Sequence, residues 1–327
     1  MTTGRIRRVA VTGLAVALLA ACGAPDDGPP AAPAASGSLP RPVNVADPAV
    51  IPSVAAAPTC DARASLRPTG ARPAPGAMPA GSTMARIVER GRLIVGIDQN
   101  AYLFGFRDPR TGELTGFEIE IAREVARALF GDPDKIQFRA ITTADRIPVL
   151  VDKKVDMVVR TMTMNCERWQ QVSFSTEYLS SHQRLLVNRG SGIRSFEDLG
   201  GRKVCATRGS TSIRVIAAQP SKPIPVSTDS TLDCLVLLQQ GQVDAVSTID
   251  VLLAGLNAQD PSTEIVGTPL TDEPAGIGIN KDAPDFVRFV NQVLETMRAD
   301  GTWKKIYARW LTPLGPTPEP PPARYRD

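Results

Sequence analysis

The stretch KIQFRAITTADRIPVLVDKKVDMVVRT, residues 135–161, holds a complete strand–helix–strand unit and decides the fold class. Apolar residues alternate with polar ones in 135–140 and cluster in 155–159, a pattern typical of two short strands at 135–140 and 155–161. Residues 146–153 between them fit a helix, with Pro148 in the first turn, where its missing N–H is not needed. Strands joined through a helix lie parallel in one sheet, so this unit predicts an α/β fold.

The same alternation continues on both sides of this unit. Before it, the pattern predicts a helix at 84–90, a strand at 92–97, a hairpin turn at 108–112 and an amphipathic helix at 118–130. After it come predicted strands at 202–207 and 243–248, and helices at 195–199, 210–217, 229–240, 251–257, 284–299 and 303–311. Repeated units of this kind predict mostly parallel sheets with helices on both faces. In such sheets ligands bind beyond the carboxyl ends of the strands.

The N-terminus has the features of an export signal. Arg5, Arg7 and Arg8 precede an apolar run, residues 9–21, that is shorter than the roughly 20 residues a bilayer-spanning helix needs. The run ends at Cys22 in Leu-Ala-Ala-Cys, the pattern at which bacterial lipoproteins are cleaved and acylated. We therefore expect a signal peptide at 1–21 and a lipid anchor at Cys22 on the outer face of the cell membrane. The alternative is an ordinary signal followed by an unrelated cysteine.

Two proline-rich segments flank the predicted folded part. Residues 23–83 hold 13 of the 29 prolines, together with much Ala, Gly and Ser. Such a composition cannot bury enough apolar surface to offset the entropy of ordering, so 22–83 is expected to be an extended tether and 316–327 a tail. The net charge of +3, without a basic stripe interleaved with aromatic residues, argues against nucleic-acid binding.

Four cysteines follow the predicted lipidation site, and in an exported protein an even number suggests two disulfides. Three pairings are possible. Cys205 and Cys234 fall in one short stretch and are the favoured pair, which leaves Cys60 with Cys166. A metal site is the weaker alternative because no Cys-x-x-Cys spacing exists and His182 is the single histidine. No metal and no cofactor are expected.

Four motifs resemble those of the polar-amino-acid substrate-binding proteins of ABC importers. They are Leu93-Ile-Val-Gly-Ile-Asp98, Thr115-Gly-Phe-Glu-Ile-Glu-Ile121, the run 155–168 followed by Phe174-Ser175, and Gly301-Thr-Trp303 with Ile306, Tyr307 and Trp310. Together they span about 85–312. The cysteine box, the tether and Asp61-Ala-Arg-Ala-Ser-Leu-Arg-Pro68 resemble more narrowly the glutamine/glutamate-binding lipoproteins of mycobacteria and related actinobacteria.

This resemblance implies a periplasmic-binding-protein fold of type II, in which two lobes joined by two crossing strands close on a ligand. Lobe 1 would comprise 84–178 and 276–315, and lobe 2 would comprise 182–272. The expected ligand is an amino acid, and the expected partner is an ABC permease or a membrane sensor protein. A rival implied by the same fold is an enzyme of the cyclohexadienyl-dehydratase kind, although the chain has no Gly-x-Ser-x-Gly motif and its histidine lies near a predicted crossing.

A zwitterion can be buried only where each of its charges finds a partner. Arg168 matches the family's arginine that clasps the α-carboxylate, for which the guanidinium fork is suited. Thr161 and Thr163 match positions that bond the same end of the ligand. By position alone, Arg168 could be a solvated helix residue and the two threonines only strand formers.

The second lobe is expected to contribute hydroxyls and N–H groups at a helix start. Thr207, Ser210 and Thr211 match this contribution, and donors at a helix start favour an anion. Ser210 or Thr211 could instead be a plain helix cap.

Three charged residues bear on the ligand side chain. Arg146 lies in a run that resembles that of acidic-amino-acid binders, where the arginine meets the side-chain carboxylate. Arg160 adds a second cation. Asp98 resembles the aspartate of glutamine binders and would repel an acid unless an arginine paired with it. Two cations favour glutamate or aspartate as ligands, with the amides binding less well.

The chain departs from the family at the ammonium site. Where members place an aspartate after the strand that matches 244–249, this chain has Ile249 followed by Asp250. Three readings are open: Asp250 holds the ammonium, Asp98 holds it, or the ligand is not a standard α-amino acid.

Overall fold

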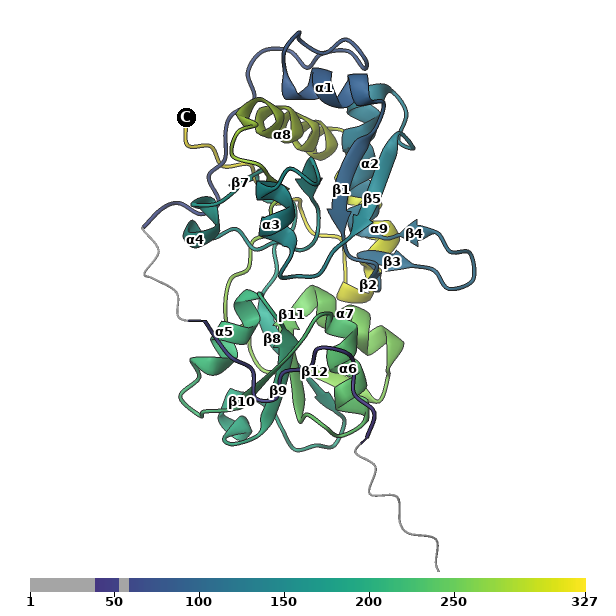
Figure 1. Ribbon diagram of the computed structural model, residues 1–327. Coiled ribbons are helices and arrows are strands. Elements are labelled where there is room, and N and C mark those ends of the chain that lie inside the picture. Colours follow the sequence, from purple (N-terminus) through teal and green to yellow (C-terminus); the bar gives the residue numbers. More distant parts are fainter. Residues whose placement is uncertain (1–38, 53–58) are drawn as a thin grey trace, which may run out of the picture. The chain divides into compact units, whose positions relative to one another are not determined.

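The computed structural model describes residues 39–52 and 59–327, and Pro40–Asp327 form one compact unit (Figure 1). The predicted signal peptide and Cys22 lie outside the described residues. The helices are α1 (Thr83–Arg90), α2 (Phe117–Phe130), α3 (Arg146–Val151), α4 (Cys166–Trp169), α5 (Thr211–Ala217), α6 (Thr231–Gln239), α7 (Asp250–Gln259), α8 (Pro284–Ala299) and α9 (Thr302–Trp310), with short 3-10 turns η1 (Phe196–Leu199) and η2 (Thr312–Leu314).

The first large sheet has the strand order β5-β1-β6-β13-β7. Its strands are β1 (Leu93–Ile97), β5 (Ile136–Ala140), β6 (Met157–Val158), β7 (Ser173–Phe174) and β13 (Gly278–Ile279). The strand β1 pairs in parallel with β5 and β6, whereas β13 is antiparallel to β6 and β7. Helices α2, α8 and α9 pack together beside it. We call the part built from this sheet with α1–α4, α8 and α9 lobe 1.

The second large sheet has the order β10-β9-β11-β8-β12. Its strands are β8 (Gln183–Asn188), β9 (Lys203–Thr207), β10 (Ile224–Thr228), β11 (Ala245–Ile249) and β12 (Thr263–Val266). The strand β9 pairs in parallel with β10 and β11, whereas β8 is antiparallel to β11 and β12. We call the part built from this sheet with α5–α7 lobe 2. A three-stranded sheet of β2 (Asn100–Ala101), β3 (Gly105–Arg107) and β4 (Leu114–Thr115) holds the predicted turn at 108–112. It contacts α2 and is counted with lobe 1.

The two-lobed α/β fold is thus confirmed, and in each large sheet four of the five strands run in the same direction. Both large sheets are mixed because β8 and β13 arrive from the opposite lobe and run against their neighbours. The chain crosses between lobes after β7 and again after β12, and the crossings pair through Leu179 with Ala275 and His182 with Asp272. The predicted residue boundaries of the lobes stay a prediction.

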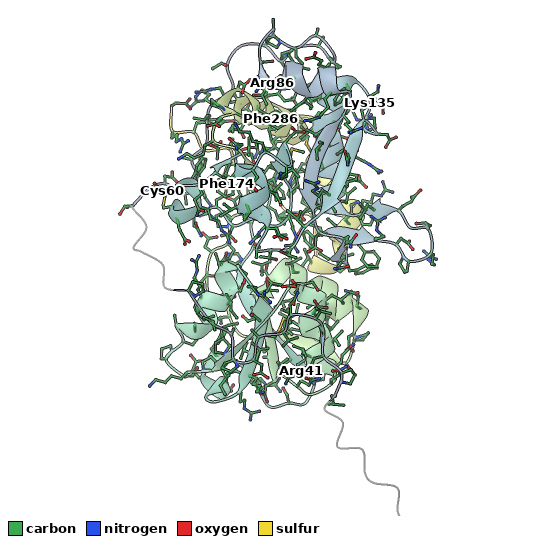
Figure 2. All side chains as sticks on the ribbon, in the orientation of Figure 1. Arg41, Cys60, Arg86, Lys135, Phe174 and Phe286 are labelled. Carbon is green, nitrogen blue, oxygen red and sulfur yellow. A yellow bond between two sulfur atoms is a disulfide. The ribbon has the colours of Figure 1, made fainter. Side chains whose placement is uncertain are left out.

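Successive side chains of a strand point to opposite faces of the sheet, and this alternation explains how lobe 2 is held together. Leu185 and Val187 of β8 face one apolar cluster, whereas Leu186 between them faces another. Each face of the sheet is therefore covered by helices, and neither face meets water. Lobe 1 contains the larger cluster, in which Phe286 is completely buried. Figure 2 shows Phe286 and Phe174 inside the unit, and Arg86 and Lys135 at its surface.

The expected tether is wrong for the parts of it that the structure describes. Residues 39–52 run beside β10, where Ala46 exchanges two main-chain hydrogen bonds of 2.9 Å with Ser227 (Figure 1). Val45 and Ile51 pack against the apolar clusters of lobe 2. An extended segment can pair with a sheet edge whatever its average composition, and composition alone could not show this.

Residues 59–83 and the tail at 316–327 pack on lobe 1 instead of extending from it. The buried Ser65 hydroxyl donates to the Phe174 carbonyl at 2.7 Å, and its main chain bonds Arg324 and Arg326 of the tail. The Arg326 guanidinium lies 4.3 Å from the centre of the Trp169 ring. The tail therefore has specific contacts, contrary to the expectation from its proline content.

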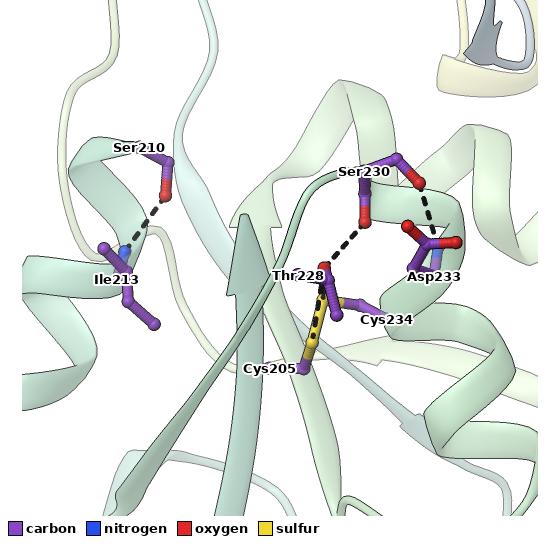
Figure 3. The surroundings of a disulfide bond; sticks show 7 residues. All are labelled: Cys205, Ser210, Ile213, Thr228, Ser230, Asp233 and Cys234. Carbon is purple, nitrogen blue, oxygen red and sulfur yellow. Dashed lines mark hydrogen bonds between the residues drawn. A yellow bond between two sulfur atoms is a disulfide. The ribbon is translucent and has the colours of Figure 1, made fainter. Parts of the chain in front are cut away.

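Both favoured disulfides are present. Cys205 of β9 is joined to Cys234 of α6 (Figure 3). Cys60 is joined to Cys166, the first residue of α4, so the N-terminal segment is fastened to lobe 1. Among the described residues, no helix combines the length and apolar character that crossing a membrane requires.

Candidate functional site

A narrow polar cavity lies between lobes 1 and 2 at the carboxyl ends of their strands. The cavity volume is about 20 Å³, so the two lobes leave little room between them. Lobe 1 lines it with residues that follow β5 and β6, and lobe 2 with residues at the ends of β9 and β11 and the starts of α5–α7. The lining residues are Thr143, Arg146, Arg160, Thr161, Thr163, Thr207, Ser210, Thr211, Ser212, Thr231, Thr248, Ile249 and Leu252.

Arg146, the first residue of α3, is buried and lacks a carboxylate partner within the described residues. Its Nε donates to the Thr143 carbonyl at 2.9 Å, and Nη1 donates to the carbonyls of Arg160 and Thr161. Burial lowers the pKa of Arg146 well below its ordinary value, and the nearby Arg168 and Arg160 add to this effect. A buried guanidinium without an anion favours a negatively charged ligand.

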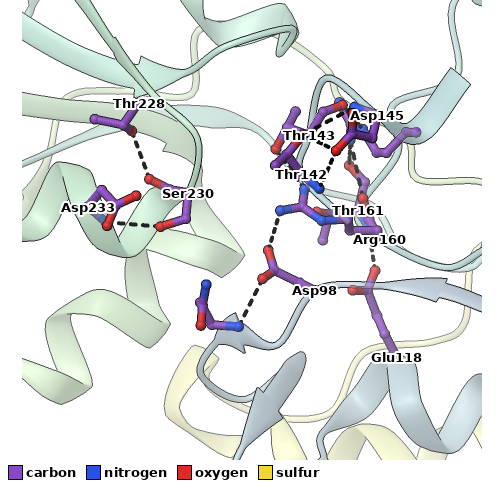
Figure 4. Close-up of polar contacts among 12 residues, drawn as sticks. Asp98, Glu118, Thr142, Thr143, Asp145, Arg160, Thr161, Thr228, Ser230 and Asp233 are labelled. Carbon is purple, nitrogen blue, oxygen red and sulfur yellow. Dashed lines mark hydrogen bonds and ion pairs between the residues drawn. The ribbon is translucent and has the colours of Figure 1, made fainter. Parts of the chain in front are cut away.

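Arg160 and Asp98 form a buried ion pair, with 2.7 Å between Nη2 and Oδ2 (Figure 4). Nη1 of Arg160 also donates to the Thr143 hydroxyl at 2.6 Å, whereas its buried Nε has no partner among the described residues. The other carboxylate oxygen of Asp98 accepts the Asn100 N–H at 2.9 Å. The pairing that the sequence requires for an acidic ligand is therefore present.

Glu118 of α2 lies beneath Thr161, and its importance to the site was not predicted. Thr161 has a φ of 39°, in the left-handed region that β-branched residues rarely adopt, and its N–H donates to Glu118 Oε1 at 2.5 Å. Tyr178 donates its hydroxyl to the same oxygen. Burial raises the pKa of Glu118 to about 7, so near neutral pH it carries only part of a negative charge.

The wall that lobe 2 contributes is built from helix starts. The Ser210 hydroxyl accepts the Ile213 N–H at 3.1 Å and so acts as the cap of α5 (Figure 3). Thr207, the last residue of β9, also lines the cavity. Ser210 thus has the helix-capping role that the sequence left open, while Thr207 keeps a hydroxyl that is not bonded to any described residue.

Arg168 is buried behind the cavity and does not line it. Its Nη1 donates to the Thr163 carbonyl at 2.8 Å, and its Nη2 donates to the Gly209 carbonyl of lobe 2 at 3.3 Å. Burial lowers the pKa of Arg168 to about 10, against the opposing effect of Glu273. In this structure the side chain therefore links the lobes, and its contact with a ligand stays a prediction.

Glu273, on the second crossing, was not predicted either. One carboxylate oxygen accepts the hydroxyls of Thr163 in lobe 1 at 2.6 Å and Thr211 in lobe 2 at 2.8 Å. The other accepts the Thr271 hydroxyl at 2.9 Å. The crossing thus uses one buried carboxylate to hold both walls of the cavity.

Asp250 does not line the cavity, whereas Ile249 does. The carboxylate of Asp250 accepts the main-chain N–H of Val251 at 2.9 Å and that of His182 at 3.2 Å. It therefore stabilises the start of α7 and its junction with the first crossing. The role of Asp250 as a ligand contact stays a prediction.

The lobes meet at two glycines outside the cavity. A Cβ on Gly255 of α7 would lie 2.6 Å from the carbonyl oxygen of Tyr102 in lobe 1. A Cβ on Gly209 would lie 2.9 Å from the Cα of Ala144, and the φ of Gly209 is 75°. Side chains at either position would hold the lobes apart.

Comparison with known proteins agrees with this architecture. The family of bacterial extracellular solute-binding proteins, family 3, matches residues 93–313. The ABC transporter glutamine-binding protein GlnH of Bacillus subtilis is 36% identical over 230 residues, covering 70% of this chain and 84% of that protein. The glutamate-binding protein GluB of Corynebacterium glutamicum is 30% identical over 231 residues, covering 67% of this chain and 78% of that protein.

A solved structure of an ancestral arginine-binding protein bound to arginine is similar with a TM-score of 0.63 and 34% identity, covering 68% of this chain and 99% of that chain. Residues 39–52 and 59–92 of this chain precede the region that the family matches. These relatives bind solutes and are not enzymes. The chain belongs to family 3 of the bacterial extracellular solute-binding proteins.

Proposed function

We propose that this protein captures an acidic amino acid, glutamate or aspartate, between its two lobes and presents it to an ABC permease. The observation that carries this proposal is the buried Arg146 on the cavity wall, whose three hydrogen bonds all go to main-chain carbonyls. The Arg160–Asp98 ion pair supports it, because a neutralised Asp98 does not repel an acid. Relatives named for binding glutamine and glutamate support an amino acid of this class as the ligand.

Binding and closure are coupled through the two walls. In an open form each wall is hydrated, and a ligand that bridges them binds the closed form more tightly, so it shifts the population toward closure. The hydroxyls that Glu273 holds from both lobes stabilise the same closed arrangement. A permease can then distinguish a loaded protein from an empty one by its shape. A membrane sensor protein is the second candidate partner, since it could read the same closure.

Lipid attachment at Cys22 would keep the protein at the outer face of the membrane, as in the actinobacterial lipoproteins that the sequence resembles. Replacing Cys22 with Ala should move the protein from the membrane fraction to the soluble fraction. An unchanged distribution would contradict lipid anchoring.

Calorimetric titration of the protein with glutamate, aspartate, glutamine, asparagine and arginine tests the ligand. We expect the two acids to bind most tightly and the amides less tightly. Binding of arginine alone, or of none of the five, would overturn the proposal.

A further inference from the structure

We infer that the cavity recognises the carboxylates of its ligand and, within the described residues, offers no anion to an ammonium group, so that small dicarboxylates without an amine are ligands of this protein. This inference rests on the proposed function, because it concerns the same cavity and the same preference for acids. It goes further by assigning a class of solute that contains no amino group.

The lining of the cavity has only one sign of charge. Of the thirteen lining residues two are arginines, nine carry hydroxyl groups and two are aliphatic. Within the residues that the structure describes, no carboxylate belongs to this lining. An ammonium inside would face the guanidinium of Arg146, which has no carboxylate partner among the described residues and repels it at short range.

Two nearby carboxylates are engaged by the protein beside the cavity. Asp98 pairs with Arg160 at 2.7 Å and accepts the Asn100 N–H. Asp250 points to the main chain of His182 and Val251, while Ile249 takes the place on the wall. Freeing either carboxylate for an ammonium would leave a buried arginine or a helix start without its partner, which opposes the exchange.

The other two carboxylates lie behind the walls. Glu118 is covered by the main chain of Thr161 and by Tyr178. Glu273 already accepts three hydroxyls, those of Thr163, Thr211 and Thr271. Burying an ammonium without an anion is strongly unfavourable, whereas guanidinium and hydroxyl donors satisfy carboxylates well.

The decisive experiment compares glutarate with glutamate, which differ only by the amino group. Both are titrated calorimetrically into the same preparation of the full chain at pH 7. We expect glutarate to bind as tightly as glutamate or more tightly. A weaker affinity for glutarate would overturn the inference and leave the proposed function intact.

Two further outcomes separate the inference from the proposed function. Binding of glutarate without binding of glutamate would support the inference and reject an amino acid as the ligand. Binding of neither acid would overturn both.

A pair of variants tests why the cavity would favour glutarate over glutamate. Ile249→Asp places a carboxylate on the wall, and Ile249→Asn is its uncharged match. We expect Ile249→Asp to shift the ratio of affinities toward glutamate by at least about tenfold, equivalent to about 1.4 kcal/mol, because the new carboxylate attracts the ammonium. Ile249→Asn should leave the ratio unchanged. Because each ratio is measured on one variant, any loss of stability cancels, and equal ratios in the two variants would contradict the inference.

Discussion

The two walls of the cavity differ in what they offer a solute. Lobe 1 contributes both arginines of the lining, Arg146 and Arg160, with Asp98 and Glu118 immediately behind them. Lobe 2 contributes six hydroxyl residues and two aliphatic ones, and no charged residue of its described chain belongs to the lining. Charge recognition is thus confined to one wall, and the opposite wall is neutral.

This difference suggests a division of work between the lobes. A neutral hydroxyl wall is easily hydrated when the lobes are apart, so exposing it has a small cost. The buried Arg146, which has no carboxylate partner among the described residues, is held in an unfavourable state until an anionic solute arrives. We therefore expect lobe 1 to select the solute and lobe 2 to set how firmly the closed form is held. The predictions below test this division in order of expected effect.

The largest effect is expected from Arg146→Met. It should weaken glutamate binding by about 100-fold, because truncating one partner of a buried charge pair costs about 2–5 kcal/mol. Glutamine, which lacks the second carboxylate, should lose much less. Titration of both ligands into the variant checks this, with Arg146→Lys as the control that keeps the charge. An equal loss for the acid and its amide would contradict the role given to lobe 1.

The next largest effect is expected in the pH dependence of the free energy of unfolding. The pKa of Glu118 is raised to about 7 in the folded protein from an ordinary value of 4.5. The folded state therefore holds a proton that the unfolded state releases, and the stabilisation is complete below 4.5 and is lost as pH rises toward 7.

Glu118→Gln removes this titration. Urea unfolding at several pH values should show the free energy of unfolding of the parent falling relative to the variant as pH rises from 4.5 to 7, and then levelling. Glu264→Gln, in lobe 2 beside Arg194, is a control for an acid outside the cavity. Parallel curves for the parent and Glu118→Gln would show that lobe 1 carries no such buried acid.

Arg160→Ala should change the selectivity of lobe 1 more than its affinity. Removing the guanidinium frees the carboxylate of Asp98, which then repels acids and attracts cations. The affinity ratio of glutamate to arginine should fall by about tenfold, which is equivalent to about 1.4 kcal/mol. Competition titration gives this ratio, and a ratio unaffected by the change would mean that Asp98 does not face the ligand.

The smallest effect is expected from the neutral wall. Thr207→Val removes one hydroxyl and keeps the side-chain shape, so all tested ligands should weaken by about fivefold, in line with about 1 kcal/mol for a hydrogen bond. Because lobe 2 does not select by charge, the loss should be the same for glutamate and glutamine. A loss confined to the acid would show that the division between the lobes is not real.

Local patterns in the sequence predicted the individual helices and strands of the fold. The strand–helix–strand run at 135–161 forms β5, α3 and β6 as expected, although β6 is limited to Met157–Val158. The antiparallel direction of β8 and β13 could not be predicted, since it depends on which lobe the chain arrives from. The packing of residues 39–52 was missed because it depends on the edge of β10, far along the chain.

For the site, the sequence indicated the residue types better than their contacts. The hydroxyls and arginines of the lining stand in motifs that resemble those of known binders, and seven of the ten predicted residues line the cavity. The orientation of Asp250 depends on the N–H of His182, 68 residues away, which no local pattern encodes. Glu118 lies within a recognised motif, but only its burial under Thr161 distinguishes it from other helix carboxylates.

Gly255 and the Tyr102 carbonyl lie so close together that they limit how near the two lobes can approach each other. Main chain meets main chain there, so the narrowest form of the crevice is fixed by the protein and not by its cargo. A solute short enough for the cavity allows Gly255 and Tyr102 to come into contact. A longer solute keeps the lobes apart before this contact forms. The length of the solute would then set how far the two lobes can close.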